Sequence, residues 1–130
     1  MLKFLFRVKS IYFKNNYYTF ALEHLFFFVI NSMKRTFINK LKTFFPSYPV
    51  EKAWVFGSYA RGEEKGESDI DIMVRFKKDA HITLFDYAGI INDLEVLFQK
   101  KIDLVQEGRL KKFARESAEQ ERILVYERTN

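Results

Sequence analysis

Two predicted strands within residues 53–76 constrain the fold of this chain more than any other feature. Residues 53–56 form a short apolar run that predicts the first strand. In residues 69–76, isoleucine and valine recur at every second position, which is typical of a strand with one buried face. Asp69 and Asp71 are two positions apart, so their carboxylates leave the same face of that strand. Because two neighbouring carboxylates repel each other, the pattern indicates a divalent cation between them.

A glycine and a serine follow the first predicted strand. Gly57 and Ser58 end the strand at the point where residues 59–61 can begin a short helical turn. Unpaired backbone N–H groups at the start of a helix attract phosphate. A phosphate-binding turn that faces a divalent-metal site suits a nucleoside triphosphate, and the sequence therefore predicts such a ligand.

The order of the predicted elements is α-β-α-β-α-β-α-β, which indicates an α+β domain. Apolar residues at helical spacing predict a first helix within residues 34–45, a second that starts at Leu84 and ends at Lys100–Lys101, and a third within residues 110–122. Two further strands are predicted at 101–105 and 123–126. Thr83 and Asp86 resemble a capping box before the second of these helices. The expected apolar faces of the second and third helices consist of Leu84, Tyr87, Ala88, Ile91, Leu94 and Phe98, and of Leu110, Phe113 and Ala114.

Residues 1–32 differ from the rest of the 130-residue chain, because they contain seven of its 15 phenylalanines. We expect an N-terminal hydrophobic helical extension, either packed on the domain of residues 33–130 or preceding a true start at Met33. The longest unbroken apolar run near the end of this segment, Leu25–Ile30, is far shorter than the roughly 20 residues that span a bilayer. With neither a transmembrane span nor a signal peptide predicted, we expect a cytoplasmic protein. A helix on the membrane surface is a less favoured alternative for this segment.

The net charge of +5 is unevenly distributed along the chain. Residues 1–32 hold four basic residues and one acidic residue, whereas residues 33–130 hold eighteen and sixteen, which leaves a net charge of only +2 there. This near balance argues against a dedicated nucleic-acid-binding surface. The chain has no cysteine, so disulfides and thiolate metal sites are excluded.

The motif of residues 57–71 resembles a known signature. Gly57-Ser58, ten residues and then Asp69-Ile70-Asp71 are similar to the G-S-x10-D-x-D pattern of the DNA-polymerase-β-like nucleotidyltransferases. The sequences GSYARG and SDIDIMV most resemble the minimal nucleotidyltransferases, the antitoxin partners of HEPN-domain toxins. The resemblance covers roughly residues 34–126 and implies a polymerase-β-like fold, in which helices pack on a small mixed sheet.

The resemblance also implies roles for individual residues. Gly57 and Ser58 would contact the triphosphate of ATP, with Arg61 as a further phosphate contact. Asp69 and Asp71 would bind one or two Mg²⁺ ions, and Asp103 in the sequence KIDLV would be the third carboxylate, as a metal ligand or base. The implied reaction transfers AMP from ATP to a hydroxyl group, which in the antitoxin branch is a tyrosine of the toxin.

Several functions are compatible with this pattern. We favour an adenylylating antitoxin of a type VII-like toxin–antitoxin pair, because all three carboxylates are present. The alternatives are a catalytically silent antitoxin that neutralises the toxin by binding alone, and a nucleotidyltransferase that acts on a small molecule. Transfer to a small molecule is less favoured because the chain is too short for a second domain to hold the acceptor. Shortness and weak charge also disfavour RNA tailing or DNA polymerisation.

Overall fold

The structure is a computed structural model and describes residues 19–129. The chain divides into two compact units, residues 1–40 and 41–130, and helix α2 (Thr19–Phe44) passes through this division. Part of the predicted extension, residues 19–32, is therefore helical, while residues 1–18 lie outside the described residues. The domain boundary predicted between residues 32 and 33 stays a prediction. Within the described part of the chain, no helix is both long and apolar enough to cross a membrane.

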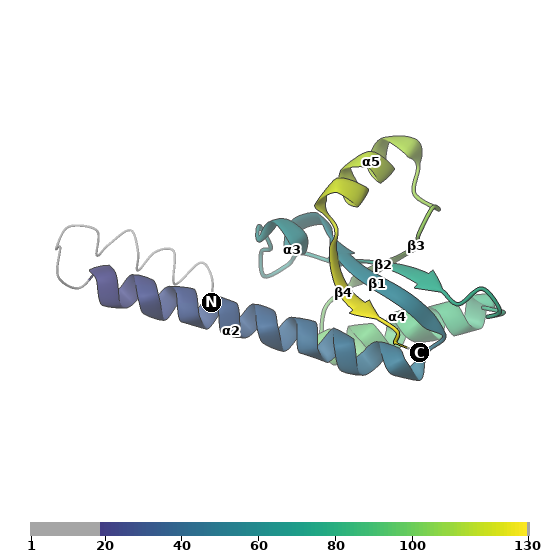
Figure 1. Cartoon of the computed structure of the whole chain (residues 1–130), viewed down its shortest axis with the longest axis horizontal. Coiled ribbons are helices and arrows are strands. Elements are labelled where there is room, and N and C mark those ends of the chain that lie inside the picture. The colour runs from purple at the N-terminus through teal and green to yellow at the C-terminus, as the bar shows by residue number, and fades with distance from the viewer. Residues whose placement is uncertain (1–18, 130) are drawn as a thin grey trace. The chain divides into compact units, whose positions relative to one another are not determined.

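Residues 41–130 are built on a four-stranded sheet (Figure 1). A short 3-10 helix, η1 (Phe45–Ser47), leads from α2 into it. The strands lie in the order β3-β2-β1-β4, and they are β1 (Val50–Phe56), β2 (Ile70–Phe76), β3 (Ile102–Gln106) and β4 (Ile123–Glu127). Strand β1 pairs antiparallel with both β2 and β4, whereas β2 and β3 are parallel. The sheet is mixed, and the predicted α+β order α-β-α-β-α-β-α-β is confirmed.

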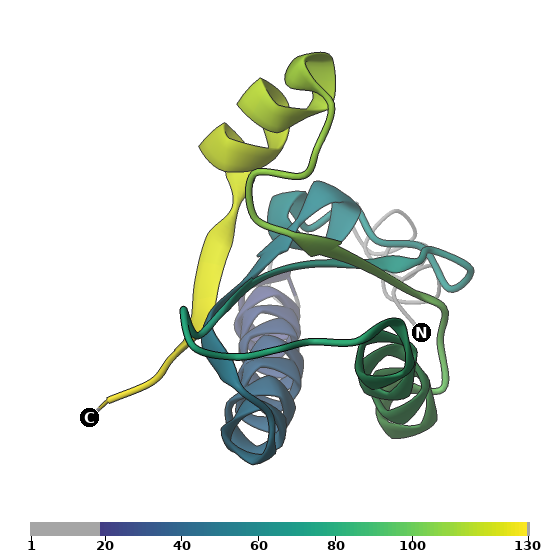
Figure 2. The same cartoon turned by 90° about the vertical axis from the view of Figure 1, so that its right-hand side faces the viewer.

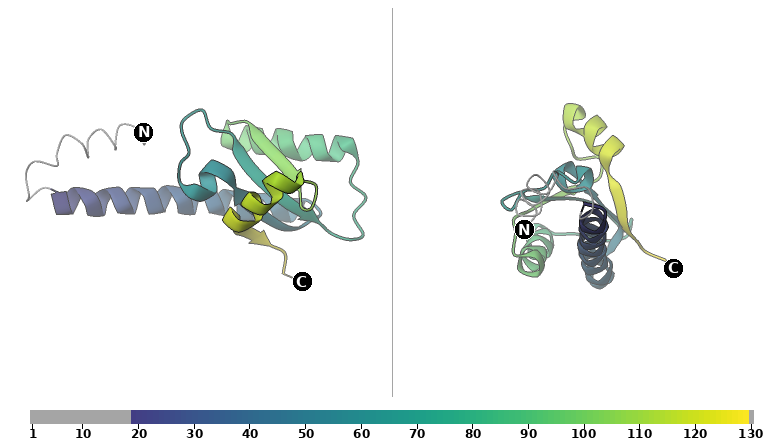
Figure 3. Two further views of the ribbon diagram at one scale, coloured as in Figure 1. Left: turned by 90° about the horizontal axis from the view of Figure 1, so that it is seen from above. Right: turned by 90° about the vertical axis from the view of Figure 1, so that its left-hand side faces the viewer.

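Helices lie on both faces of this sheet. Helix α4 (Leu84–Phe98) lies on one face, and α3 (Gly57–Arg61) and α5 (Lys112–Glu121) lie on the other (Figures 2 and 3). Parallel strands cannot be joined by a tight turn, and α4 supplies the crossover from β2 to β3. Side chains on neighbouring positions of a strand therefore enter two different buried environments.

Each face of the sheet has its own apolar contacts. Val55, Ile72 and Leu104 are register partners across three strands and are all buried. On the opposite face, Trp54 and Met73 form a cluster with Ala118 of α5. The sheet is thus covered on both sides along β1 and β2, which explains why Ala53, Trp54 and Val55 are consecutive buried residues.

Helix α4 begins with the predicted capping box. The Thr83 hydroxyl accepts the N–H of Asp86 at 3.2 Å, and the Asp86 carboxylate accepts the N–H of Thr83 at 2.9 Å. The expected apolar face is wrong at Leu84, which is 81% exposed, and at Ala88, which is also exposed, whereas Ile90, which lies outside the expected face, is buried. Leu84 is the first residue of the helix, and contact with the sheet begins later in the first turn, where the hydroxyl of Tyr87 donates to the carbonyl oxygen of Leu104 on β3.

Helix α5 presents a different side to the sheet than expected. The predicted apolar contact of Phe113 is wrong, since this side chain is 80% exposed, and Ala118 faces the sheet instead. Five positions correspond to about 140° around a helix, so these two residues cannot share a face. Leu110, also expected on that apolar face, packs against the Trp54 cluster from the loop before α5.

We predict that Leu94→Ala lowers the free energy of unfolding by about 3 kcal/mol, because Leu94 is fully buried and its removal leaves a cavity. Val96→Ala on the same helix is the matched control, since Val96 is 64% exposed and its truncation should change stability by at most about 0.5 kcal/mol. Urea unfolding of both variants measures the difference. Equal stabilities for the two variants would contradict the assignment of Leu94 to the core.

Candidate active site

The register between β2 and β3 makes Asp71 and Asp103 direct partners. Register partners on adjacent strands project their side chains to the same face of the sheet. Two carboxylates from segments that are far apart in the sequence therefore lie side by side. Further along the same two strands, Met73 and Val105 are also partners, and both belong to the apolar contacts beneath α5. The carboxylate pair thus lies on the face that carries α3 and α5.

Asp71 is the electrostatic centre of the site. It is half-buried, and this burial is the largest cause that raises the pKa of its carboxyl group above the usual value. The negative charges of Asp103 and then Asp69 raise this pKa further, while the Arg61 guanidinium opposes them. All four of these residues are candidates from the sequence, and the charges of the other three act on Asp71. Asp69 immediately precedes β2 and is exposed.

The donor set suits a hard divalent cation that is shared with a phosphate ligand. Among residues 19–129, no three His, Cys, Asp or Glu side chains are grouped closely enough to form a complete metal site. Mg²⁺ usually takes only one or two protein carboxylates and completes its shell with water and substrate phosphates. The paired carboxylates of Asp71 and Asp103, with Asp69 within electrostatic range, provide that kind of partial site.

Gly57 lies directly against the Asp71 carboxylate. Its φ angle is +67°, a conformation that residues with a side chain rarely adopt, and a Cβ atom built on it would lie 2.2 Å from Asp71 Oδ2. The start of α3 therefore lies so close to the Asp71 carboxylate that a residue with a side chain at position 57 would displace it. Ser58 is the next residue of α3, and its carbonyl oxygen accepts the N–H of Glu63 at 2.9 Å, which closes the turn.

Arg61 connects the site to α5. Its Nε donates to Glu63 at 2.9 Å, and its Nη1 donates to Glu121 at 2.7 Å. The Glu121 carboxylate also accepts the hydroxyl of Ser117 at 3.1 Å. The guanidinium that the sequence suggests for phosphate contact is thus held by two carboxylates in this structure. These ion pairs are exposed, and their energetic contribution to the fold is small.

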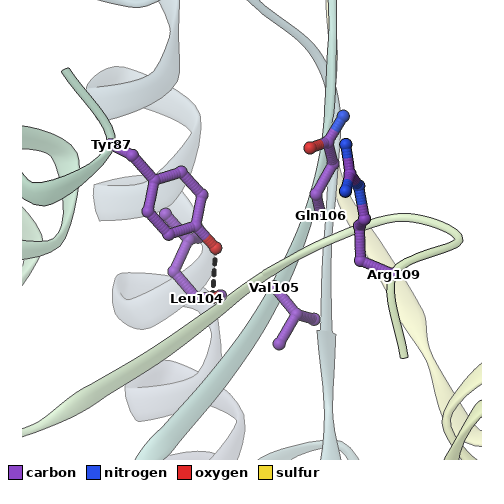
Figure 4. A pocket seen from close by; sticks show the side chains of 5 residues that line it. All are labelled: Tyr87, Leu104, Val105, Gln106 and Arg109. Atoms are coloured by element: carbon purple, nitrogen blue, oxygen red, sulfur yellow. Dashed lines mark hydrogen bonds between the residues drawn. The ribbon is translucent and has the colours of Figure 1, made fainter. Parts of the chain in front are cut away.

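Two residues of this region could not be recognised from the sequence. Glu121 belongs to a charged stretch without any motif, and only the contact between α3 and α5 reveals its pairing with Arg61. Periodicity places Tyr87 on the apolar face of its helix, but its hydroxyl donates to the carbonyl oxygen of Leu104 on β3. Burial, and then the charge of Asp103, raises the pKa of Tyr87. Figure 4 shows the cavity that Tyr87 and Leu104 line.

Comparison with known proteins agrees with this geometry. Residues 34–125 match the family model described as "Nucleotidyltransferase domain". A relative from Methanocaldococcus jannaschii, described as a candidate protein adenylyltransferase, is 38% identical over 79 residues, which are 60% of this chain and 79% of the relative.

Two solved structures share the fold. A crystal structure of a toxin–antitoxin with AMP-PNP superposes with a TM-score of 0.60 at 18% identity, over 70% of this chain and 73% of that one. A tri-AMPylated Shewanella oneidensis HEPN toxin in complex with MNT antitoxin gives a TM-score of 0.56 at 15% identity, over 73% of both chains. At these identities the two structures establish the arrangement of the backbone.

We predict that Gly57→Ala destabilises the protein by about 2 kcal/mol, because the added Cβ requires a strained φ and displaces the Asp71 carboxylate. Gly66→Ala is the matched control, since φ is ordinary there and a Cβ at this position would have no atom within 4 Å. Its effect should stay within about 0.5 kcal/mol. Thermal unfolding measures the stability of the two variants. If Gly57→Ala is as stable as Gly66→Ala, the close approach of Gly57 to Asp71 is contradicted.

We further predict that Asp71→Asn raises the melting temperature at neutral pH. The pKa of Asp71 is raised on folding, so the folded protein binds the proton more tightly and loses stability as the pH rises above the unfolded value. The neutral asparagine avoids this loss. The gain should vanish below about pH 4, where the carboxyl is protonated even in the unfolded chain. Asp79→Asn, in an exposed loop, is the control and should show no such gain.

Proposed function

The chain belongs to the nucleotidyltransferase domain family, and from that premise we propose that it transfers AMP from ATP to a tyrosine hydroxyl of a partner HEPN-domain toxin. This activity makes it the antitoxin of a type VII-like toxin–antitoxin pair. The observation that carries the proposal is the side-by-side placement of Asp71 and Asp103, with the Gly57 backbone against the Asp71 carboxylate.

In the proposed reaction, the acceptor oxygen attacks the α-phosphorus of ATP. The bond from the α-phosphorus to the bridging oxygen of the β-phosphate breaks, pyrophosphate leaves, and Asp103 takes the proton of the acceptor hydroxyl. Asp103 suits this role because it is exposed while its partner Asp71 is half-buried. The exposed carboxylate can reach a hydroxyl presented by another protein.

The remaining candidates act on the nucleotide. Asp69, Asp71 and Asp103 would hold one or two Mg²⁺ ions, which would supply Lewis-acid chemistry by neutralising charge on the phosphates. Gly57 lets the triphosphate approach the backbone of α3, and Ser58 donates a hydrogen bond to a phosphate oxygen. Arg61 contributes a further phosphate contact, for which it exchanges one of its two carboxylate partners.

The choice of a protein acceptor is supported by the relatives. The Methanocaldococcus relative is described as acting on protein, and one of the solved structures holds an AMPylated HEPN toxin with its antitoxin. Arg61 and both carboxylates of the pair lie on one face of the sheet, next to the exposed Asp69 that precedes β2. Because ATP is the donor, we place the reaction in the cytoplasm.

Incubation with Mg²⁺, ATP labelled on the α-phosphate and a co-encoded HEPN-domain protein tests this proposal. We expect the label on a tyrosine of the partner, with release of pyrophosphate. Asp71→Asn should reduce the labelling rate by about 100-fold or more, because several kcal/mol of charge stabilisation are lost. Removal of Mg²⁺ with EDTA should abolish labelling.

Asp79→Asn is the matched control and should label the partner at the unmodified rate, since Asp79 lies in an exposed loop. Mass spectrometry identifies the labelled side chain. If the partner is neutralised without any label, the catalytic proposal fails and the function is binding alone. If the label appears only on small molecules such as aminoglycosides, the protein acceptor is wrong.

A further inference from the structure

A cavity of about 300 Å³ lies at the C-terminal end of β3, and its walls combine apolar and polar groups (Figure 4). It is lined by Tyr87 from α4, by Leu104, Val105 and Gln106 from β3, and by Arg109 from the loop that follows. Neither the candidate metal ligands nor the Gly57 turn belongs to this lining. The cavity is therefore a separate feature beside the carboxylate pair.

Part of the cavity wall belongs to the same strand as Asp103. Leu104 directly follows Asp103, and Val105 is two positions further on, so Val105 and Asp103 leave the same face of β3. The charge of Asp103 also acts on the Tyr87 hydroxyl, which lies at the wall of the cavity. The distance along the strand from Asp103 to Gln106 corresponds to about 10 Å. One short polypeptide segment can reach from the carboxylate to the cavity.

Two polar side chains that line the cavity are available to bind a ligand. In the part of the chain that the structure describes, the guanidinium of Arg109 and the side-chain amide of Gln106 have no hydrogen-bond or ion-pair partner. The two side chains lie next to each other (Figure 4). The Tyr87 hydroxyl, by contrast, is already bonded to the carbonyl oxygen of Leu104. The cavity thus offers an apolar wall, one free cation and one free amide among the described residues.

We infer that this cavity holds a segment of the partner protein next to the acceptor tyrosine, with an acidic side chain of that segment paired with Arg109. The inference rests on the proposed function and assigns residues that recognise the acceptor. Arg109 binds the carboxylate through its planar fork, and Gln106 donates a further hydrogen bond. Leu104, Val105 and the Tyr87 ring cover the aliphatic part of the segment.

A protein segment fits this cavity better than a nucleic acid. Nucleic-acid backbones are bound by several cations along a strand, whereas the cavity lining contains only one among the described residues. The apolar surface also continues beyond the cavity, since Leu84 lies one helical turn before Tyr87 and is 81% exposed. Arginine and exposed apolar side chains are both common in protein interfaces.

Arg109→Glu, compared with Lys112→Glu, tests the inference. Both substitutions change the charge by the same amount, and Lys112 is exposed outside the cavity lining. We expect Arg109→Glu to raise the KM for the HEPN-domain partner at least tenfold, as for the loss of one charged hydrogen bond, with the KM for ATP unchanged. Lys112→Glu should change the KM for the partner by less than about threefold.

The affinity of the complex, measured in an Asp71→Asn background, separates this inference from the proposed function because it requires no transfer. Arg109→Glu should weaken this affinity at least tenfold, and exchange of one acidic residue of the partner for arginine should restore it. Unchanged affinity, or an equal loss with Lys112→Glu, would overturn the inference. Weakened affinity without any labelling by the unmodified protein would support the docking site while refuting AMP transfer.

Discussion

The parallel pairing of β2 with β3 is the interaction on which the rest of the site depends. It makes Asp71 and Asp103 direct partners, and a shift of the register by a single residue would turn Asp103 to the opposite face. Parallel neighbours need a long connection, and α4 provides it. The capping box at Thr83 and the buried side chain of Leu94 therefore help to determine where two remote carboxylates meet.

The site combines features that are unfavourable for folding. A half-buried carboxylate faces a second one, and a backbone turn with positive φ presses against it. Such local conflicts are expected where a ligand of opposite charge completes the structure. The cost is confined to one corner of the sheet, since the fully buried residues of β1 and β2 are all hydrophobic. The buried apolar residues of β1 and β2 thus stabilise the fold, while the candidate site lies at the end of these strands that carries Asp71.

Much of this architecture follows from local patterns in the sequence. Alternation identifies the strand that carries Asp71, and the Thr83 capping box locates the start of α4. Periodicity does not tell how far a helix extends past the sheet or which side it turns inward, so the predicted apolar faces of α4 and α5 are wrong at Leu84 and Phe113.

Contacts between remote segments are equally inaccessible from the sequence. Arg61 and Glu121 are 60 residues apart, and their pairing depends on the folded positions of α3 and α5. Nothing in the local patterns connects Tyr87 with the charge of Asp103, because an apolar helix face and a strand are predicted independently. Asp69 and Asp71 can be found because the spacing of their motif is visible in the sequence itself, and Asp103 can be found through the resemblance to a family that carries a third carboxylate on a later strand.

Trp54 has a further consequence, because it is the chain's single tryptophan. The guanidinium of Arg122 lies 4.5 Å from its ring centroid and that of Arg75 lies 5.6 Å away, and Glu107 binds both cations. Arg122 ends α5 and directly follows Glu121, the partner of Arg61. Any displacement of α5 therefore moves a positive charge relative to the indole. The protein carries its own fluorescent reporter, whose emission registers the movement of this helix without an attached dye.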